Sequence, residues 1–249
     1  MTKMAAPVVY EPRTYRDFDE TGRFKTFRVV IDTSDLYVKA HLVLEKETEE
    51  LIRTCRGQIQ AAIERRPEFL KSLVPIEQDP ADGPVAAKMI KAGQKAGTGP
   101  MAAVAGAVAE FVGRALLRKS PEVIVENGGD IFLMVAQPIV VGLFAGESPF
   151  NNRVGIRVEP TAIPLGVCTS SGTVGPSLSL GIADCATVVS RDAALADAVA
   201  SGLGNRIQGP SDLGRAVEWA MKVPGVDGAL AIIRDRMAAL GDIELVPLK

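Results

Sequence analysis

The chain has 249 residues with 28 basic and 30 acidic side chains, and its net charge of -2 excludes the basic surface that nucleic-acid binding requires. Hydrophobic residues make up 47% of the sequence but aromatic residues only 5%, which predicts an aliphatic core in one large domain or two small ones. The longest apolar stretch, Ile131 to Phe144, contains Gln137-Pro138 and is too short to span a bilayer. Residues 1–20 lack the apolar segment of a signal peptide, so we expect a cytoplasmic protein with neither a membrane nor a nucleic-acid partner.

The cysteines and the histidine limit the chemistry that the chain can carry. Cys55, Cys168 and Cys185 are too far apart in sequence for a C-x-x-C zinc or redox motif, and we expect free thiols. His41 is the single histidine, and an exposed strand position explains it more simply than catalysis does. A histidine-rich metal site is therefore excluded, and any bound metal should be a hard ion held by oxygen, such as Mg²⁺.

The N-terminal half predicts an arm, a hairpin and helices, in that order. Residues 1–22 are polar and form an arm with little expected structure of its own. Apolar residues alternate between Phe24 and Leu44 on both sides of a turn at Asp32–Asp35, as in a β-hairpin. Apolar residues at helical spacing then predict helices at Thr48–Arg65, Pro84–Lys95 and Met101–Leu117.

The helix Met101–Leu117 is apolar nearly all round, which is typical of a central, buried helix. Its charged residues, Glu110 and Arg114, are four positions apart and can pair on one face. Small residues let neighbouring backbone approach closely, so we expect Gly106 to lie at a tight contact with the sheet or with a cofactor cleft.

The C-terminal half predicts strands first and then strands alternating with helices. Short apolar runs predict strands at 122–126, 131–136, 139–145, 154–158, 165–168, 186–189, 229–233 and 243–246, with helices at 192–204 and from 211 or 212 to 222. Asn127–Asp130 and Gln137-Pro138 are typical of connections between adjacent antiparallel strands. Because no linker or repeat divides the chain, we predict one α+β domain over residues 23–249, with a largely antiparallel sheet covered by helices.

A segment rich in small polar residues follows the strand at 165–168. Its hydroxyls and its glycine come from Thr169, Ser170, Ser171, Thr173 and Gly172. Hydroxyls and backbone N–H groups packed this densely suit phosphate or another anion, so we expect a ligand loop here. The alternative is a turn whose hydroxyls bond to their own backbone.

Asp197, Ser201 and Cys168 suit specific chemistry. Asp197 and Ser201 are four positions apart on a predicted helix, so their oxygens share one face and can hold Mg²⁺ together with waters or substrate phosphate. A solvated helix face or a local hydrogen bond is the alternative. Cys168, where the strand meets the loop, would be a nucleophile if backbone N–H groups lowered the pKa of its thiol. The alternative is a core cysteine at the end of a strand.

Asp130 and Asp184 each have a structural and a functional interpretation. Asp130 follows Gly128 and Gly129 and either caps the hairpin turn or contacts a ligand. Asp184 is either a second carboxylate for a metal or a turn residue, and the sequence leaves both open.

Taken together, motifs between residues 97 and 205 resemble the ApbE-like family of FAD:protein FMN transferases. Residues 105–110 stand in the place of the family's helix motif Lys-Gly-Tyr-Ala-Val-Asp, and Asn127–Ile131 matches its Gly-Gly-Asp turn. Cys168–Gly172 matches its Thr-Ser-Gly loop, and Ala196–Ser201 resembles its Ala-Asp-Ala-x-x-Thr motif. The order and spacing of these motifs carry the resemblance.

The resemblance implies an ApbE-like fold and a nucleotide-like ligand, FAD or FMN. The implied ligand contacts are Gly128, Gly129, Asp130 and the segment Thr169–Thr173, and the implied Mg²⁺ ligands are Asp197 and Ser201. The implied reaction is the transfer of FMN to a hydroxyl of an acceptor protein, with the metal at the pyrophosphate.

The chain departs from the family pattern at two places. Ala105 replaces a lysine expected to hold the cofactor, and residues 176–184 replace the family's His-x-x-Asp-Pro-x-Thr-Gly segment. The chain therefore resembles a divergent ApbE-like branch, which has been associated with sulfur assimilation and homocysteine formation. Two alternatives to flavin transfer follow: a thiol-dependent enzyme of that kind that uses Cys168, or a non-catalytic homo-oligomer whose cofactor cleft is vestigial.

Overall fold

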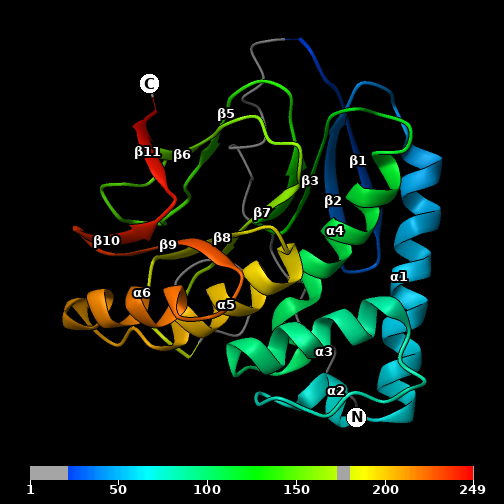
Figure 1. Ribbon diagram of the computed structural model, residues 1–249, viewed down its shortest axis with the longest axis horizontal. Coiled ribbons are helices and arrows are strands. Elements are labelled where there is room, and N and C mark those ends of the chain that lie inside the picture. The colour runs from blue at the N-terminus through cyan, green and yellow to red at the C-terminus, as the bar shows by residue number, and fades with distance from the viewer. Residues whose placement is uncertain (1–21, 173–179, 249) are drawn as a thin grey trace, which may run out of the picture.

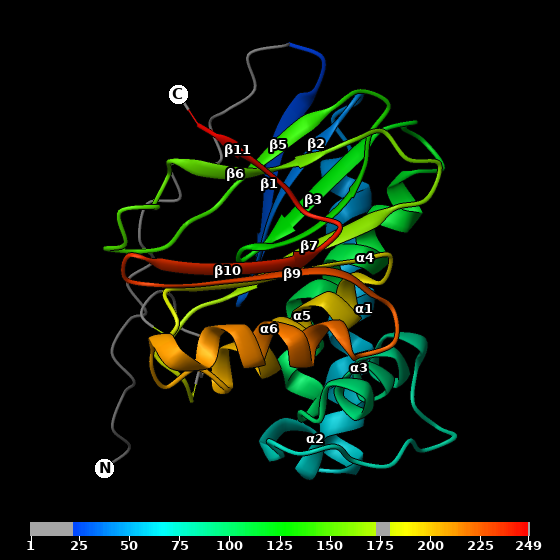
Figure 2. The ribbon, with the colours of Figure 1, turned by 60° about the vertical axis from the view of Figure 1, so that its left-hand side comes forward.

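The computed structural model describes residues 22–172 and 180–248, which leaves most of the predicted arm and Thr173 outside the described residues. Two antiparallel sheets form the centre of the molecule. The larger has the strand order β1-β2-β3-β4-β7-β8-β9-β10, and the smaller has the order β11-β6-β5. Helices cover one face of the larger sheet, and the smaller sheet packs on the other (Figures 1 and 2). The predicted α+β fold with a largely antiparallel sheet is thus confirmed.

The N-terminal hairpin consists of β1 (Lys25–Ile31) and β2 (Ser34–Ala40). Asp32 in its turn has a φ of 51°, which a short polar side chain tolerates. Arg56 of the first helix donates to the Asp32 carboxylate at 2.8 Å and ties the turn to the helical layer. The predicted hairpin is confirmed.

Each predicted helix is present, with small shifts at its ends. The helical elements are α1 (Glu45–Arg65), α2 (Glu68–Lys71), α3 (Pro84–Ala96), η2 (Pro100–Ala103), α4 (Val104–Leu116), α5 (Ala193–Asn205), η3 (Pro210–Asp212) and α6 (Leu213–Met221). Helix α3 ends at Gly97, whose left-handed φ of 70° lets the chain turn sharply. The 3-10 turn η2 follows, so the α-helical part begins at Val104 and not at Met101. In the described ranges, every helix is too short or too polar to cross a membrane.

The strands β3 (Val123–Asn127) and β4 (Asp130–Met134) form a second hairpin, as predicted. Its two-residue turn uses Gly128 and Gly129 at φ values of 71° and 101°, which glycine adopts without strain. On its other side β4 pairs with β7 (Leu165–Ser170). This pairing brings the glycine turn beside the end of β7.

The predicted connection at Gln137-Pro138 is wrong. The chain leaves the larger sheet there, and β5 (Ile139–Gly142) pairs with β6 (Val154–Val158) in the smaller sheet, which β11 (Glu244–Pro247) completes. Proline has no N–H with which to continue a hydrogen-bonded ladder, so it marks a departure from the sheet at least as well as a hairpin.

The strand β7 extends further than predicted. Thr169 and Ser170 pair with residues of β8 (Cys185–Ser190), so they belong to a strand and not to a loop. Pairing on both sides of β7 overrides the low strand propensity of a hydroxyl-rich segment. The sheet continues through β9 (Val226–Ile233) to β10 (Arg236–Gly241), which the sequence does not predict.

The two faces of the larger sheet belong to different cores. Successive residues of a strand point to opposite faces, so Cys168 lies in the core under the helices and Val167 in the core between the sheets. Helix α5 crosses the middle of the helical layer and is buried along almost its whole length (Figure 1). Together with α4 it positions the candidate site.

Candidate functional site

The helices α4 and α5 cross at a contact that requires glycine. A Cβ added at Gly106 would lie 2.3 Å from the carbonyl oxygen of Ala193 and 2.8 Å from the Cβ of Asp197. Neither distance is sterically possible, so any larger residue at 106 would push the helices apart. The predicted tight contact at Gly106 is therefore confirmed, but the predicted partner is wrong, because the contact is with helix α5 and not with the sheet.

Each helix binds an amide near the N-terminus of the other. The backbone N–H of Gly106 donates to Asp197 Oδ2 at 2.8 Å, and the N–H of Ala193 donates to Glu110 Oε2 at 2.9 Å. The first backbone N–H groups of a helix have no hydrogen-bond acceptor within the helix and carry partial positive charge. A carboxylate accepts their hydrogen bonds and also offsets that charge. The crossing is thus fixed by two reciprocal caps.

Two cations and a backbone amide surround Glu110. Lys88 Nζ lies 2.9 Å and Arg114 Nε 2.6 Å from Glu110 Oε1, and Lys88 also approaches Asp192 Oδ2 at 3.2 Å. The predicted pair Glu110–Arg114 is confirmed. The additional partner, Lys88 from α3, was not predicted, although a lone acid in an otherwise apolar helix signals a buried ion pair.

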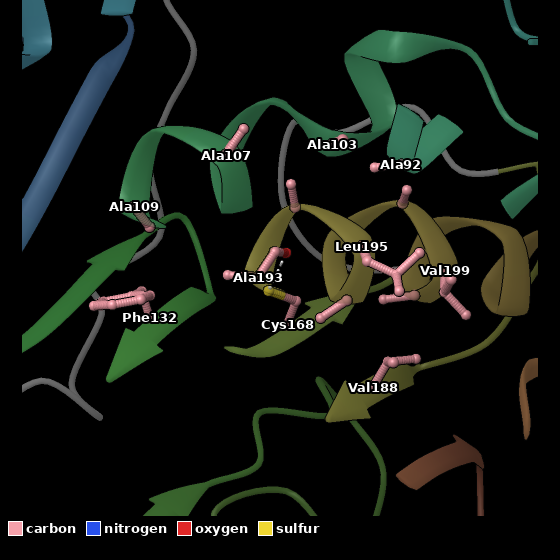
Figure 3. Close-up of a cluster of buried hydrophobic side chains, with 14 of the residues drawn as sticks. Ala92, Ala103, Ala107, Ala109, Phe132, Cys168, Val188, Ala193, Leu195 and Val199 are labelled. Carbon is pink, nitrogen blue, oxygen red and sulfur yellow. Dashed lines mark hydrogen bonds between the residues drawn. The ribbon is translucent and has the colours of Figure 1, made fainter. Parts of the chain in front are cut away.

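Asp130 and Cys168 lie side by side beneath α5. Ile131 pairs with Val167, which places the preceding Asp130 next to Cys168 on the helix-covered face. The N–H of Thr169 donates to Asp130 Oδ1 at 3.2 Å, and Cys168 Sγ donates to the carbonyl of Ala193 at 3.3 Å. Figure 3 shows this thiol pointing from its strand toward Ala193 at the start of α5.

Asp130 and Asp197 form a buried acidic pair, and within the described part of the chain neither carboxylate has a salt-bridge partner. Burial raises the pKa of Asp130 well above its ordinary value, and the charge of Asp197 raises it further. Burial also raises the pKa of Asp197 to about 7, against hydrogen bonds from the N–H groups of Gly106 and Ala105. Glu126, another acidic side chain, raises the pKa of Asp130 in the same direction. A bound cation would compensate these charges.

The chemistry of this pair fits Mg²⁺. Among the described residues, no group of three or more His, Cys, Asp or Glu side chains could hold a metal by itself. Mg²⁺ does not require such a cage, because it typically takes one or two carboxylates and completes its shell with waters and substrate phosphates. Asp197 with Ser201, one turn later on α5, and Asp130 nearby offer oxygens of this kind.

The environment of Cys168 is the opposite of the one that a nucleophile needs. The side chain is fully buried, and burial raises the pKa of its thiol well above the ordinary value, with the charges of Asp130 and Asp197 adding to the effect. A thiolate forms where positive charge stabilises it, and here the neighbours are acidic. These observations support the alternative interpretation of Cys168, a core cysteine at the end of a strand. Cys55 and Cys185 are buried as well.

The remaining residues of the predicted ligand loop do not act as one unit. Thr169 turns its hydroxyl to Thr187 at 2.8 Å, on the sheet face away from α5. A Cβ on Gly172 would lie 2.1 Å from the carbonyl oxygen of Gly181. Gly172 therefore allows these two backbone segments to pack closely. Ser170 and Ser171 remain partly exposed beyond Cys168. Gly129 lies close to this end of β7, because a Cβ added to Gly129 would be 3.9 Å from the carbonyl oxygen of Thr169.

Two other candidates lie elsewhere. Asp184 accepts a hydrogen bond from the backbone N–H of Arg234, which supports the turn interpretation. His41 Nε2 lies 2.8 Å from Glu122 Oε2, a carboxylate that Arg23 also approaches at 3.3 Å. These contacts of Glu122 were not predicted from the sequence. His41 is thus a partly exposed structural residue at the end of the N-terminal hairpin.

The fold is that of the ApbE-like proteins. The apo form of the flavinyl transferase ApbE from Pseudomonas stutzeri matches with a TM-score of 0.53 and 13% sequence identity, over 88% of this chain and 94% of that one. The ApbE protein of Thermotoga maritima also matches with a TM-score of 0.53 and 13% identity, over 86% of this chain and 96% of that one. At these identities the likeness concerns the fold alone.

The family is defined by closer relatives. Residues 16–235 match the model of the family described as AbpE bacteria. A UPF0280 protein from Methanocella arvoryzae is 46% identical over 194 residues, which cover 77% of this chain and 78% of the relative. The chain therefore belongs to this family, a divergent branch of the ApbE-like proteins, and the resemblance noted in its motifs is confirmed.

Proposed function

We propose that the protein binds a flavin nucleotide, FAD or FMN, through Mg²⁺, and transfers FMN from FAD to a hydroxyl of an acceptor protein. The proposal rests on the buried acidic pair Asp130 and Asp197. This pair lies where the glycine turn, the end of β7 and helix α5 come together. The structure from P. stutzeri is named a flavinyl transferase, which supports a flavin-related activity for this fold relative.

Each side chain has a separate part in this proposal. Asp197 and Ser201 would hold the metal from one face of α5, and Asp130 would add a carboxylate from the sheet. The metal, when bound, would neutralise charge on the pyrophosphate that is cleaved between FMN and AMP. Gly128 and Gly129 would let the backbone lie close to the ligand, and Ser170 and Ser171 would supply hydroxyls.

A thermal-shift experiment tests the proposal. FAD with Mg²⁺ should raise the melting temperature of the purified protein, since a ligand that binds only the folded state stabilises it. Asp197→Ala and Ser201→Ala should remove most of that increase. Asp184→Asn is the matched control, because Asp184 bonds to Arg234 outside the site, and it should keep the full increase.

Two outcomes would contradict the proposal. If neither FAD nor FMN changes the melting temperature in the presence of Mg²⁺, the site does not bind a flavin, and a non-catalytic homo-oligomer becomes the better interpretation. If Asp184→Asn loses the increase to the same extent as Asp197→Ala, the acidic pair is not the binding site.

A further inference from the structure

We propose that the protein forms a two-fold symmetric dimer in which β10 of one copy pairs with β10 of a second copy, the partner subunit. The pairing is antiparallel and joins the two larger sheets into one continuous sheet. This inference is independent of the proposed function, because β8 and β9 separate β10 from β7 and the candidate site. It follows from the backbone groups, the composition and the charges of this sheet edge.

The strand β10 is the last strand of the larger sheet, at the opposite margin from β1 (Figure 1). In the described ranges, no strand other than β9 pairs with it, and helix α6 packs on both β9 and β10. One backbone edge of β10 is thus turned away from the sheet. Such an edge offers a row of N–H and C=O groups to a further strand.

The hairpin between β9 and β10 shows which backbone groups point outward. Arg236 pairs with Ile233 across a two-residue turn, and the residues beside such a turn exchange both backbone hydrogen bonds. The N–H of Asp242, six positions later, donates to the carbonyl of Asp227 at 2.8 Å, which continues the same alternation. The even-numbered residues of β10 therefore bond to β9, and the odd-numbered residues direct their N–H and C=O groups outward.

The other edge strands carry features that oppose further pairing. β1 has two exposed cations, Lys25 and Arg28. β5 and β11 contain four residues each, and β11 ends in a proline. Charge, proline and short length are the usual protections of a sheet edge. By contrast, residues 237–241 of β10 contain neither a charge nor a proline, so this edge is suited to pairing.

The edge of β10 is complementary to itself in one register. If Met237 pairs with Ala239 of the partner subunit, the two-fold axis generates a second such pair, and four backbone hydrogen bonds form. Ala238 then lies opposite Ala238 of the partner subunit, where its small side chain permits close approach. Leu240 is 45% exposed, and the aliphatic stem of Arg236 of the partner subunit would cover it.

The charges at the two ends of β10 also suit a second copy of this chain. The exposed Arg234 lies in the turn before the strand, and the exposed Asp242 follows the strand. In the antiparallel register these two positions face each other, once on each side of the two-fold axis. Opposite charges that meet at the rim of an interface guide association and favour the correct register. The second copy is therefore the partner that this edge fits.

Cysteine cross-linking tests the register. In the proposed pairing, Ala238 and its symmetry mate form a non-hydrogen-bonded pair with Cα atoms about 4.5 Å apart, which is close enough for a disulfide. Ala238→Cys should therefore give an interchain disulfide on mild oxidation, seen as a dimer on a non-reducing gel. Ala239→Cys is the matched control and should not cross-link, because its symmetry mate is displaced by two positions along the strand. The native cysteines are buried, so the parent should not cross-link either.

Analytical ultracentrifugation without any ligand tests the partner. The parent should show a concentration-dependent dimer. Arg234→Asp and Asp242→Arg should each weaken dimerisation by about tenfold, because like charges then face each other at both ends of the interface. The double variant exchanges the two charges and should restore the affinity of the parent. Ala239→Pro removes an outward N–H and should be monomeric, with a melting temperature measurement to show that it is folded.

The outcomes are decisive for this edge. A parent that remains monomeric at every concentration overturns the inference, and so does a dimer that persists in folded Ala239→Pro. A dimeric parent whose Ala238→Cys variant fails to cross-link has its interface elsewhere, which also overturns it. Failure of the double charge variant to recover the affinity lost in the single variants would contradict the proposed register. Flavin binding enters none of these measurements, so the proposed function stands or falls separately.

Discussion

The α4–α5 crossing contains two buried carboxylates with the same structural role and different electrostatic surroundings. Glu110 and Asp197 each accept a backbone N–H near the start of the opposite helix. Glu110 also has Lys88 and Arg114 as partners, whereas Asp197 has the acidic Asp130 as its charged neighbour. The comparison shows that a hydrogen bond to a backbone N–H near the start of a helix does not by itself identify a functional carboxylate. The absence of a compensating cation, in the described part of the chain, is what distinguishes the two ends.

The largest expected effect comes from the glycine at the crossing itself. Gly106→Leu should lower the free energy of unfolding by about 3 kcal/mol, because the backbone of Ala193 cannot move away from the new side chain. Gly57→Leu is the matched control in α1, where an added Cβ meets nothing within 4 Å. That variant should gain about 0.8 kcal/mol, since leucine is the better helix former. Urea titrations of both variants measure the contrast, and equal stabilities would mean that the helices do not cross this closely.

A second pair of variants compares the two ends directly. Glu110→Gln should lower the free energy of unfolding by about 1–3 kcal/mol, because Lys88 and Arg114 lose their charged partner. Asp197→Asn should be neutral or stabilising in EDTA at neutral pH, because it removes a carboxyl group whose charged form burial disfavours, and the amide oxygen can still accept from Gly106. Urea unfolding in EDTA measures both. An equal loss in the two variants would show that the charge surroundings of the two carboxylates do not differ as described.

A third comparison concerns the pH dependence of stability. Burial raises the pKa of Asp197 to about 7, compared with about 3.9 for aspartate in an unfolded chain. Between these values the folded state keeps a proton that the unfolded state has lost, so the stability of the metal-free protein should fall as the pH rises from about 4 to about 7. Asp197→Asn lacks this titration, and its advantage over the parent should grow across that range. Urea titrations in EDTA at several pH values measure the difference, and a constant difference would refute the raised pKa.

Local patterns in the sequence predicted the helices, both hairpins and the fold class. They failed where pairing depends on distant segments. The apolar run in β5 predicts a strand but does not show which sheet it joins. The hydroxyls of Thr169 and Ser170 disguise a strand that pairing with β8 stabilises. β10 lacks a run of β-branched residues and is held by its neighbour β9.

The candidate site was predictable only in part, because it too depends on contacts between distant segments. The motifs indicated Asp130 and Asp197, and the structure brings Asp130 of the sheet close to Asp197 of α5. The sequence could not show that Cys168 points into the core, nor that Gly172 contacts Gly181, because both depend on which chain segment lies opposite. Of the two cations that compensate Glu110, Arg114 was predicted from its spacing, but Lys88 comes from another helix and becomes apparent only in the folded structure.

The two reciprocal caps also have a consequence for the entropy of the chain during folding. The bond from Gly106 to Asp197 joins residues 91 positions apart, and the bond from Ala193 to Glu110 joins residues 83 positions apart. Closing a loop of that size costs roughly 4 kcal/mol from its logarithmic dependence on length. Once either bond has formed, the other closes only the short helical segments 106–110 and 193–197. The chain therefore loses the large loop entropy only once, when the first of the two bonds forms. The two caps should form and break together as the protein folds and unfolds.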